Sequence, residues 1–169
     1  MRTLLRTLIL LAIVVWVGGL IFFGAVVAPI AFGTLMPMFP DPSVGLNVAG
    51  TMVRNSLLHL HAIGMICGLF LLLLCILERV TRATRRSIGP PLLFIAVMFG
   101  LTAYSQFSVI PRMETLRIQA GTAMANPSST NPARLDFNRL HNLSTSLEGI
   151  VLLCGIGLIV LYSRPEPVS

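Results

Sequence analysis

The chain has 169 residues, of which 55% are hydrophobic and only 11% are charged, and its mean hydropathy is +0.87. Soluble domains carry roughly 25% charged residues, so this composition excludes a disordered chain and an ordinary cytosolic enzyme. The net charge of +6 comes from twelve arginines and no lysine. Because these arginines fall between long apolar runs, we interpret them as anchors at the membrane ends of helices, with the lipid bilayer and not nucleic acid as partner.

Four apolar segments are each long enough to cross the roughly 30 Å hydrocarbon core of a bilayer. They cover residues 8–32, 55–77, 88–111 and 140–163. Backbone groups cannot stay unpaired in lipid, so each segment is expected to be a helix. The first is too long for the apolar region of a signal peptide. The sequence therefore predicts one domain, residues 1–169, folded as an all-α integral membrane four-helix bundle.

The arginines predict the orientation of these helices. Segment 78–86 contains four arginines and one acid, and the chain ends add Arg2, Arg6 and Arg164. Positive charge concentrates in short cytoplasmic loops, so both termini and this loop are expected in the cytoplasm. We expect a multi-pass protein of the bacterial inner membrane.

Two helices are expected to extend beyond the membrane on the outer side. Residues 112–120 continue the pattern of the third helix up to Gly121, with Glu114 and Arg117 spaced for an ion pair. Asn131 followed by Pro132 is typical of a helix start, so the fourth helix is expected to begin there. Residues 33–53 are expected to form a long outer loop.

Polar side chains within the helices gather in the outer half, where all three histidines lie. Intramembrane ionisable residues often mark functional sites. On the fourth helix His141, Ser144 and Glu148 share one face, and Glu148 lies roughly 12 Å inside the membrane at ~1.5 Å per residue. On the second helix His61 shares a face with Gly64 and Gly68, a small-residue surface for close helix packing.

The ligand or metal candidates are therefore His61, His141, Glu148 and His59. His59 lies about 200° around the helix from His61, so we expect it to meet lipid headgroups or a second protomer, since a homo-oligomer is one expected assembly. The expected supporting polar network consists of Arg54, Gln106, Arg112, Glu114, Arg139 and Ser144.

Three functions fit this cluster. It could be a metal, haem or small-ligand site, a proton or ion path of a small transporter, or a network that only holds helices or a partner together. The loop residues Met36 and Met38 could add soft ligands for copper, although methionine more often fills gaps in packing. Haem and copper are the cofactors considered. No motif of an enzyme is present, so the sequence favours a protein without catalytic activity.

Two segments resemble a known family. Ser105 to Glu114 (SQFSVIPRME) and Phe137 to Ser144 (FNRLHNLS) resemble the transmembrane protein 205-like family, a four-helix membrane domain of unknown function. The likeness lies in the Pro-Arg that ends the third helix and in the Phe-x-Arg-x-His-x-Leu-Ser that opens the fourth. The resemblance implies a four-helix membrane domain over nearly the whole chain. It implies no reaction.

Overall fold

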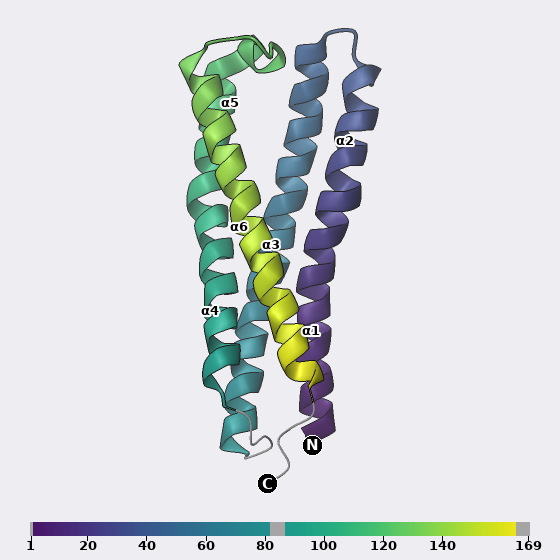
Figure 1. The fold of residues 1–169 in the computed structure, drawn as a ribbon. Helices are drawn as coiled ribbons and strands as arrows, with labels where there is room; N and C mark the ends of the chain where they lie inside the picture. The colour runs from purple at the N-terminus through teal and green to yellow at the C-terminus, as the bar shows by residue number, and fades with distance from the viewer. Residues whose placement is uncertain (1, 82–86, 165–169) are drawn as a thin grey trace.

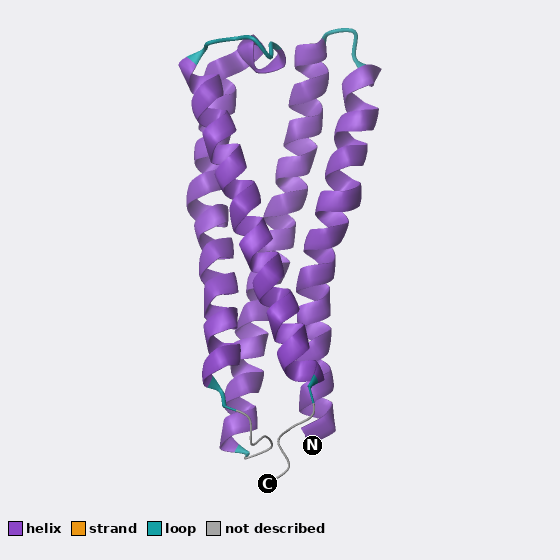
Figure 2. Cartoon of the chain, in the orientation of Figure 1, coloured by secondary structure: helices purple, strands orange, loops and turns teal. Residues whose placement is uncertain are grey.

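The computed structural model describes residues 2–81 and 87–164, and the residues described are almost entirely helical (Figure 1, Figure 2). The helices are α1 (Arg2–Phe22), α2 (Ala28–Leu35), α3 (Pro42–Val80), α4 (Gly89–Tyr104), α5 (Ile110–Ala120) and α6 (Pro132–Ser163). A π-helical turn, Phe23–Val27, joins α1 to α2, and a second, Ser105–Val109, joins α4 to α5. Short 3-10 helices follow at Met36–Met38 and Gly121–Ala125.

These elements form four continuous rods, each long and apolar enough to cross a membrane. α1 and α2 make the first rod, α3 the second, α4 and α5 the third, and α6 the fourth. The start of α1 and the end of α6 lie at one end of the bundle, here called the terminal end (Figure 1). The opposite end, the loop end, carries the turn after Met38 and the connection that follows Gly121.

The prediction of a long outer loop over residues 33–53 is wrong. α3 begins at Pro42, and only a short turn separates it from the first rod. The cause is a start signal of the same kind as the one predicted for the fourth helix. Asp41 accepts a hydrogen bond from the Ser43 backbone at 2.8 Å, and Pro42 occupies the first helical position. The hydrogen bonds from Ser43 also lower the pKa of Asp41.

The other two helix-end predictions are confirmed. α5 stops at Ala120, where Gly121 takes a φ of +52°, a conformation that favours glycine. α6 begins at Pro132, and Asn131 accepts hydrogen bonds from the backbone of Ala133 and Arg134. The third and fourth rods therefore extend past the predicted spans, as far as this loop.

The core lies toward the terminal end, where α1 packs against α3 and α6, and α4 packs against α3 and α6. Its largest fully buried side chains include those of Trp16, Leu71, Ile95, Met98 and Leu158. Trp16 lies on the Gly64 and Gly68 surface, where a Cβ on Gly64 would overlap the indole ring. The predicted close packing at these two glycines is therefore confirmed.

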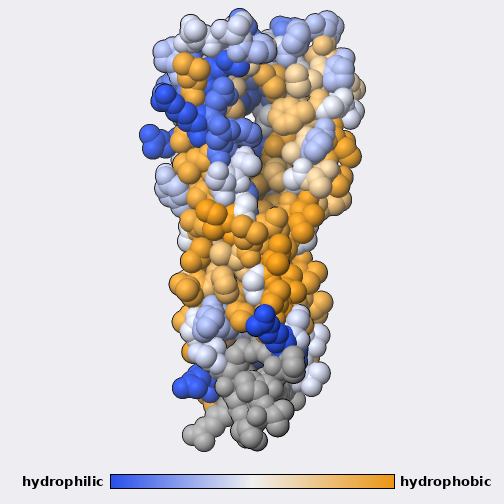
Figure 3. Space-filling view, viewed as in Figure 1, coloured by the Kyte–Doolittle hydropathy of each residue, from blue (hydrophilic) through white to orange (hydrophobic). Residues whose placement is uncertain are grey.

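The bundle changes arrangement toward the loop end. α6 packs against α1 near the terminal end and against α5 near the loop end, while α2 packs against α3. Figure 1 shows α6 crossing the bundle between these positions, so the rods form two pairs at the loop end. Figure 3 shows hydrophilic residues gathered at this end above a broad apolar surface.

Candidate functional site

A partly buried histidine–carboxylate pair connects α3 to α6 at the point where the two pairs of rods meet. His61 Nε2 lies 2.7 Å from Glu148 Oε1. The His61 side chain is 1% exposed and that of Glu148 is 20% exposed. His61 is buried on the same face of α3 as Gly64 and Gly68, as the sequence predicts. Glu148 also faces the interior, and its partner is His61 of α3.

The third rod contributes a hydroxyl to the same pair. Ser105 is fully buried, and its Oγ donates to Glu148 Oε1 over 3.4 Å. Ser105 begins the π-helical turn, a local widening of the helix that is frequent at functional sites. Thr102, one turn closer to the terminal end on the same helix face, is also buried. Three rods therefore meet at Glu148.

Several polar atoms around this junction have no hydrogen-bond partner within the part of the chain that the structure describes. They are His61 Nδ1, Glu148 Oε2, Thr102 Oγ1 and Gln106 Oε1. Buried polar groups in folded proteins are nearly always paired, and an unpaired one costs about 1–3 kcal/mol. Such a concentration of unpaired groups is typical of a site that receives water or a ligand.

A second polar network lies closer to the loop end. Arg117 donates to both Glu114 carboxylate oxygens, at 2.9 and 2.8 Å, which confirms the ion pair expected from their spacing. It also donates to the Asn47 side chain at 2.7 Å and so joins α5 to α3. Arg54 Nε approaches Glu114 at 3.8 Å. This network carries two guanidinium charges and one carboxylate charge.

The structure does not bring the other candidates to the pair. His59 is exposed, and its Nδ1 lies 2.8 Å from the Asn55 carbonyl oxygen of its own helix. His141 is exposed and stacks on Phe137 with ring centroids 6.1 Å apart. The predicted contact of His59 with headgroups or a second protomer, and the homo-oligomer itself, stay predictions.

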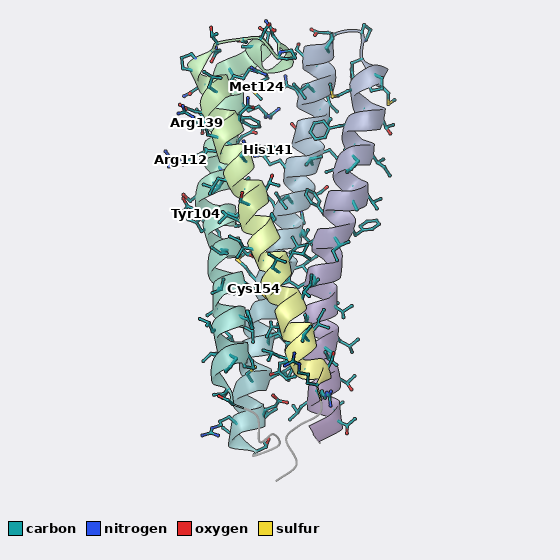
Figure 4. All side chains as sticks on the ribbon, in the orientation of Figure 1. Tyr104, Arg112, Met124, Arg139, His141 and Cys154 are labelled. Atoms are coloured by element: carbon teal, nitrogen blue, oxygen red, sulfur yellow. The ribbon has the colours of Figure 1, made fainter. Side chains whose placement is uncertain are left out.

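The predicted network divides in a similar way. Arg112 and Arg139 are exposed on α5 and α6, as Figure 4 shows, whereas Ser144 is buried one turn from Glu148. Met38 is 68% exposed, and the Met36 backbone packs on Gly45. Of the predicted network, Ser144 is buried, Arg54, Gln106 and Glu114 are partly buried, and Arg112 and Arg139 are exposed.

The donor set at the pair does not fit a metal ion. Within residues 2–81 and 87–164, no group of three or more His, Cys, Asp and Glu side chains is arranged to hold one. His61 is the one histidine at the junction, and its Nε2 is already used by Glu148. The histidine and methionine ligands considered for copper or haem do not converge there.

Sequence reasoning missed a polar cluster near the terminal end. The Tyr162 hydroxyl lies 3.4 Å from Cys75 Sγ and donates to Glu78 Oε2 over 3.3 Å. All three side chains are buried, and Glu78 is 7% exposed. Glu78 looks like a boundary residue because it follows a long apolar run. The regular spacing of Cys75 and Glu78, three residues apart on one helix face, is the signal that could have found the cluster.

Comparison with known proteins gives a family but no activity. The chain matches a family model described as a domain of unknown function, DUF4149, over residues 11–122, and it belongs to this family. No curated protein and no solved structure matches the chain. The match ends before the Phe137–Ser144 segment, so the finer resemblance to the transmembrane protein 205-like family stays a prediction.

Proposed function

We propose that this member of a family of unknown function binds a small hydrogen-bond-donating solute at the junction of His61 and Glu148. The observation that carries the proposal is the hydrogen-bonded pair, in which each partner keeps one buried polar atom unpaired. These two atoms, His61 Nδ1 and Glu148 Oε2, are the ones that a bound solute would pair.

The chemistry of the free atoms indicates the class of ligand. When His61 Nε2 carries the proton and donates it to the Glu148 carboxylate, Nδ1 is left with a lone pair. Glu148 Oε2 and Gln106 Oε1 are also acceptor atoms, and neither has a partner among the described residues. A ligand with N–H or O–H groups and few acceptors, such as an amine, complements the unpaired atoms of His61 and Glu148.

The surroundings of the pair favour binding over transport. The core toward the terminal end consists of buried, mostly apolar side chains, and Trp16, Leu71 and Met98 are each exposed by 1% or less. Glu148, in contrast, keeps a partly exposed side chain. Among the described residues, this apolar core separates the pair from the buried Cys75, Glu78 and Tyr162 cluster near the terminal end. The alternative of a proton or ion path therefore has less support.

Two matched probes test the proposal. Methylammonium has only donors and acetate has only acceptors. We expect methylammonium to raise the melting temperature of the protein in nanodiscs in a saturable manner and acetate to have no such effect. Glu148→Gln removes the carboxylate charge and should weaken methylammonium binding by roughly tenfold or more. Stabilisation by acetate alone would contradict the proposed ligand class. No response to either probe would favour a purely structural network.

The arginine distribution further supports an extracytoplasmic loop end. The predicted orientation depends on the four arginines of segment 78–86, one of which is Arg79. Residues 82–86 of this segment lie outside the described residues. Thr130 lies at the loop end, and Ser87 lies just before α4 at the terminal end. A cysteine at Thr130 should react with an impermeant thiol reagent added to intact cells, and one at Ser87 should not. The reverse labelling would move the proposed site to the cytoplasmic side.

A further inference from the structure

A second polar region lies outside the junction, between α5 and α6 at the loop end. It is a cavity of about 480 Å³. Its lining includes two arginines, Arg112 and Arg139, together with Asp136, Gln119 and the apolar side chain of Leu140. Figure 4 shows that Arg112 and Arg139 come from the two different helices and lie on the same side of the molecule.

The charges in this cavity are unbalanced. Arg139 Nη1 lies 3.2 Å from Asp136 Oδ1, in an exposed pair. Arg112 forms no ion pair or hydrogen bond through its side chain with any residue in the two described ranges. Two guanidinium groups and one carboxylate leave one net positive charge. Guanidinium groups present several fixed N–H donors, which match the oxygen atoms of a phosphate group.

The position of the cavity along the rods indicates where such a phosphate would lie. Arg112 directly follows the apolar span 88–111, and Arg139 directly precedes the span 140–163. Both guanidinium groups therefore belong to the level at which the hydrocarbon core ends and the lipid headgroups begin. Leu140 lies beside them on the apolar side of this boundary.

We propose that the α5–α6 cavity binds a phosphate group through Arg112 and Arg139. The phosphate belongs to an anionic phospholipid headgroup or to a water-soluble phosphate ester, since both present the same oxygen atoms to the two arginines. This site is separate from the one at His61 and Glu148, and it does not depend on that proposal.

The experiment measures binding by thermal stabilisation of the detergent-purified protein, with phosphatidylglycerol in one arm and glycerol 3-phosphate in the other. We expect saturable stabilisation by phosphatidylglycerol. Arg112→Gln and Arg139→Gln should each weaken this binding by roughly tenfold, the effect of one charged hydrogen-bond donor. Arg134→Gln is the matched control, because Arg134 also lies on α6, donates to the Ser129 carbonyl and does not line the cavity.

The two arms identify the source of the phosphate. A response to phosphatidylglycerol alone assigns the cavity to lipid, and a response to glycerol 3-phosphate that Arg112→Gln removes assigns it to soluble phosphate esters as well. Asp136→Asn should tighten binding, because it frees Arg139 and removes a competing charge, and misfolding does not produce a gain of affinity. The proposal is overturned when neither probe stabilises the wild type, or when Arg134→Gln weakens binding as much as Arg112→Gln.

Discussion

The terminal half and the loop half of this bundle are built from the same rods but filled differently. In the terminal half, large apolar side chains interlock, and Trp16 lies on the surface of Gly64 and Gly68. In the loop half, α6 packs against α5 instead of α1. His61 and Glu148 lie between the helices there, together with several polar atoms that have no hydrogen-bond partner. Stability is thus concentrated in one half, and the groups that cost stability lie in the other.

The terminal half also contains buried polar side chains, which sharpens the contrast. Cys75, Tyr162 and Glu78 form a chain of contacts at 3.4 and 3.3 Å. The atoms of this cluster are not among those left without a partner, whereas both members of the His61–Glu148 pair are. Both halves therefore contain buried polar side chains, and they differ in whether the polar atoms have hydrogen-bond partners.

The largest expected loss of stability comes from placing a larger side chain in the tightly packed terminal half. Gly64→Leu places a side chain where the Trp16 indole lies, and overpacking of this kind costs roughly 1–3 kcal/mol or more. Gly100→Leu is the control, because a Cβ there meets nothing within 4 Å, and it should change stability by less than about 0.5 kcal/mol. Equal unfolding free energies for the two variants in a denaturant titration would contradict the close packing.

A smaller loss is expected from removing the carboxylate in the loop half. Glu148→Leu leaves His61 Nε2 and Ser105 Oγ without their acceptor and should cost about 1–3 kcal/mol. Glu148→Gln keeps an acceptor oxygen and should cost less. Equal losses in the same titration would mean that the hydrogen bonds at Glu148 do not contribute to stability.

The smallest expected differences concern the arginines of the loop end. Arg117→Gln breaks contacts with Glu114 and Asn47 that join α5 to α3, and it should cost on the order of 1 kcal/mol. Arg139→Gln breaks an exposed pair within one helix and should cost less than about 0.5 kcal/mol. Thermal denaturation in the absence of anionic lipid measures both. A greater loss for Arg139→Gln would contradict the role of Arg117 in joining α5 to α3.

Much of the fold could be predicted from the sequence, because hydropathy alone selects helices in lipid. The start of α6 at Asn131 and the stop of α5 at Gly121 also follow from local chemistry. The start of α3 was missed although Asp41 and Pro42 carry a signal of the same kind. The glycines and Asn47 that follow them favour a loop by composition, and tertiary packing overrides that preference, as where Gly45 contacts the Met36 backbone.

The candidate site was only partly predictable. The inward faces of His61 and Glu148 follow from helical spacing. Their pairing does not, because it depends on how α3 and α6 are aligned, and no local pattern contains that information. His141 was expected beside Glu148, but seven residues of a straight helix drift by ~20° from a heptad repeat. At that height α6 has crossed toward α5, so His141 is exposed.

The central claim is that the His61–Glu148 pair is retained for a ligand and at some expense of stability. The most direct test is the double variant His61→Leu with Glu148→Leu, studied in nanodiscs by thermal denaturation with and without methylammonium. Replacing a buried ionisable pair by apolar side chains is often neutral or stabilising by about 1–4 kcal/mol. We predict that the double variant melts at or above the wild-type temperature and no longer responds to methylammonium. A double variant less stable than the wild type and than either single variant would contradict the claim and would make the pair a structural element.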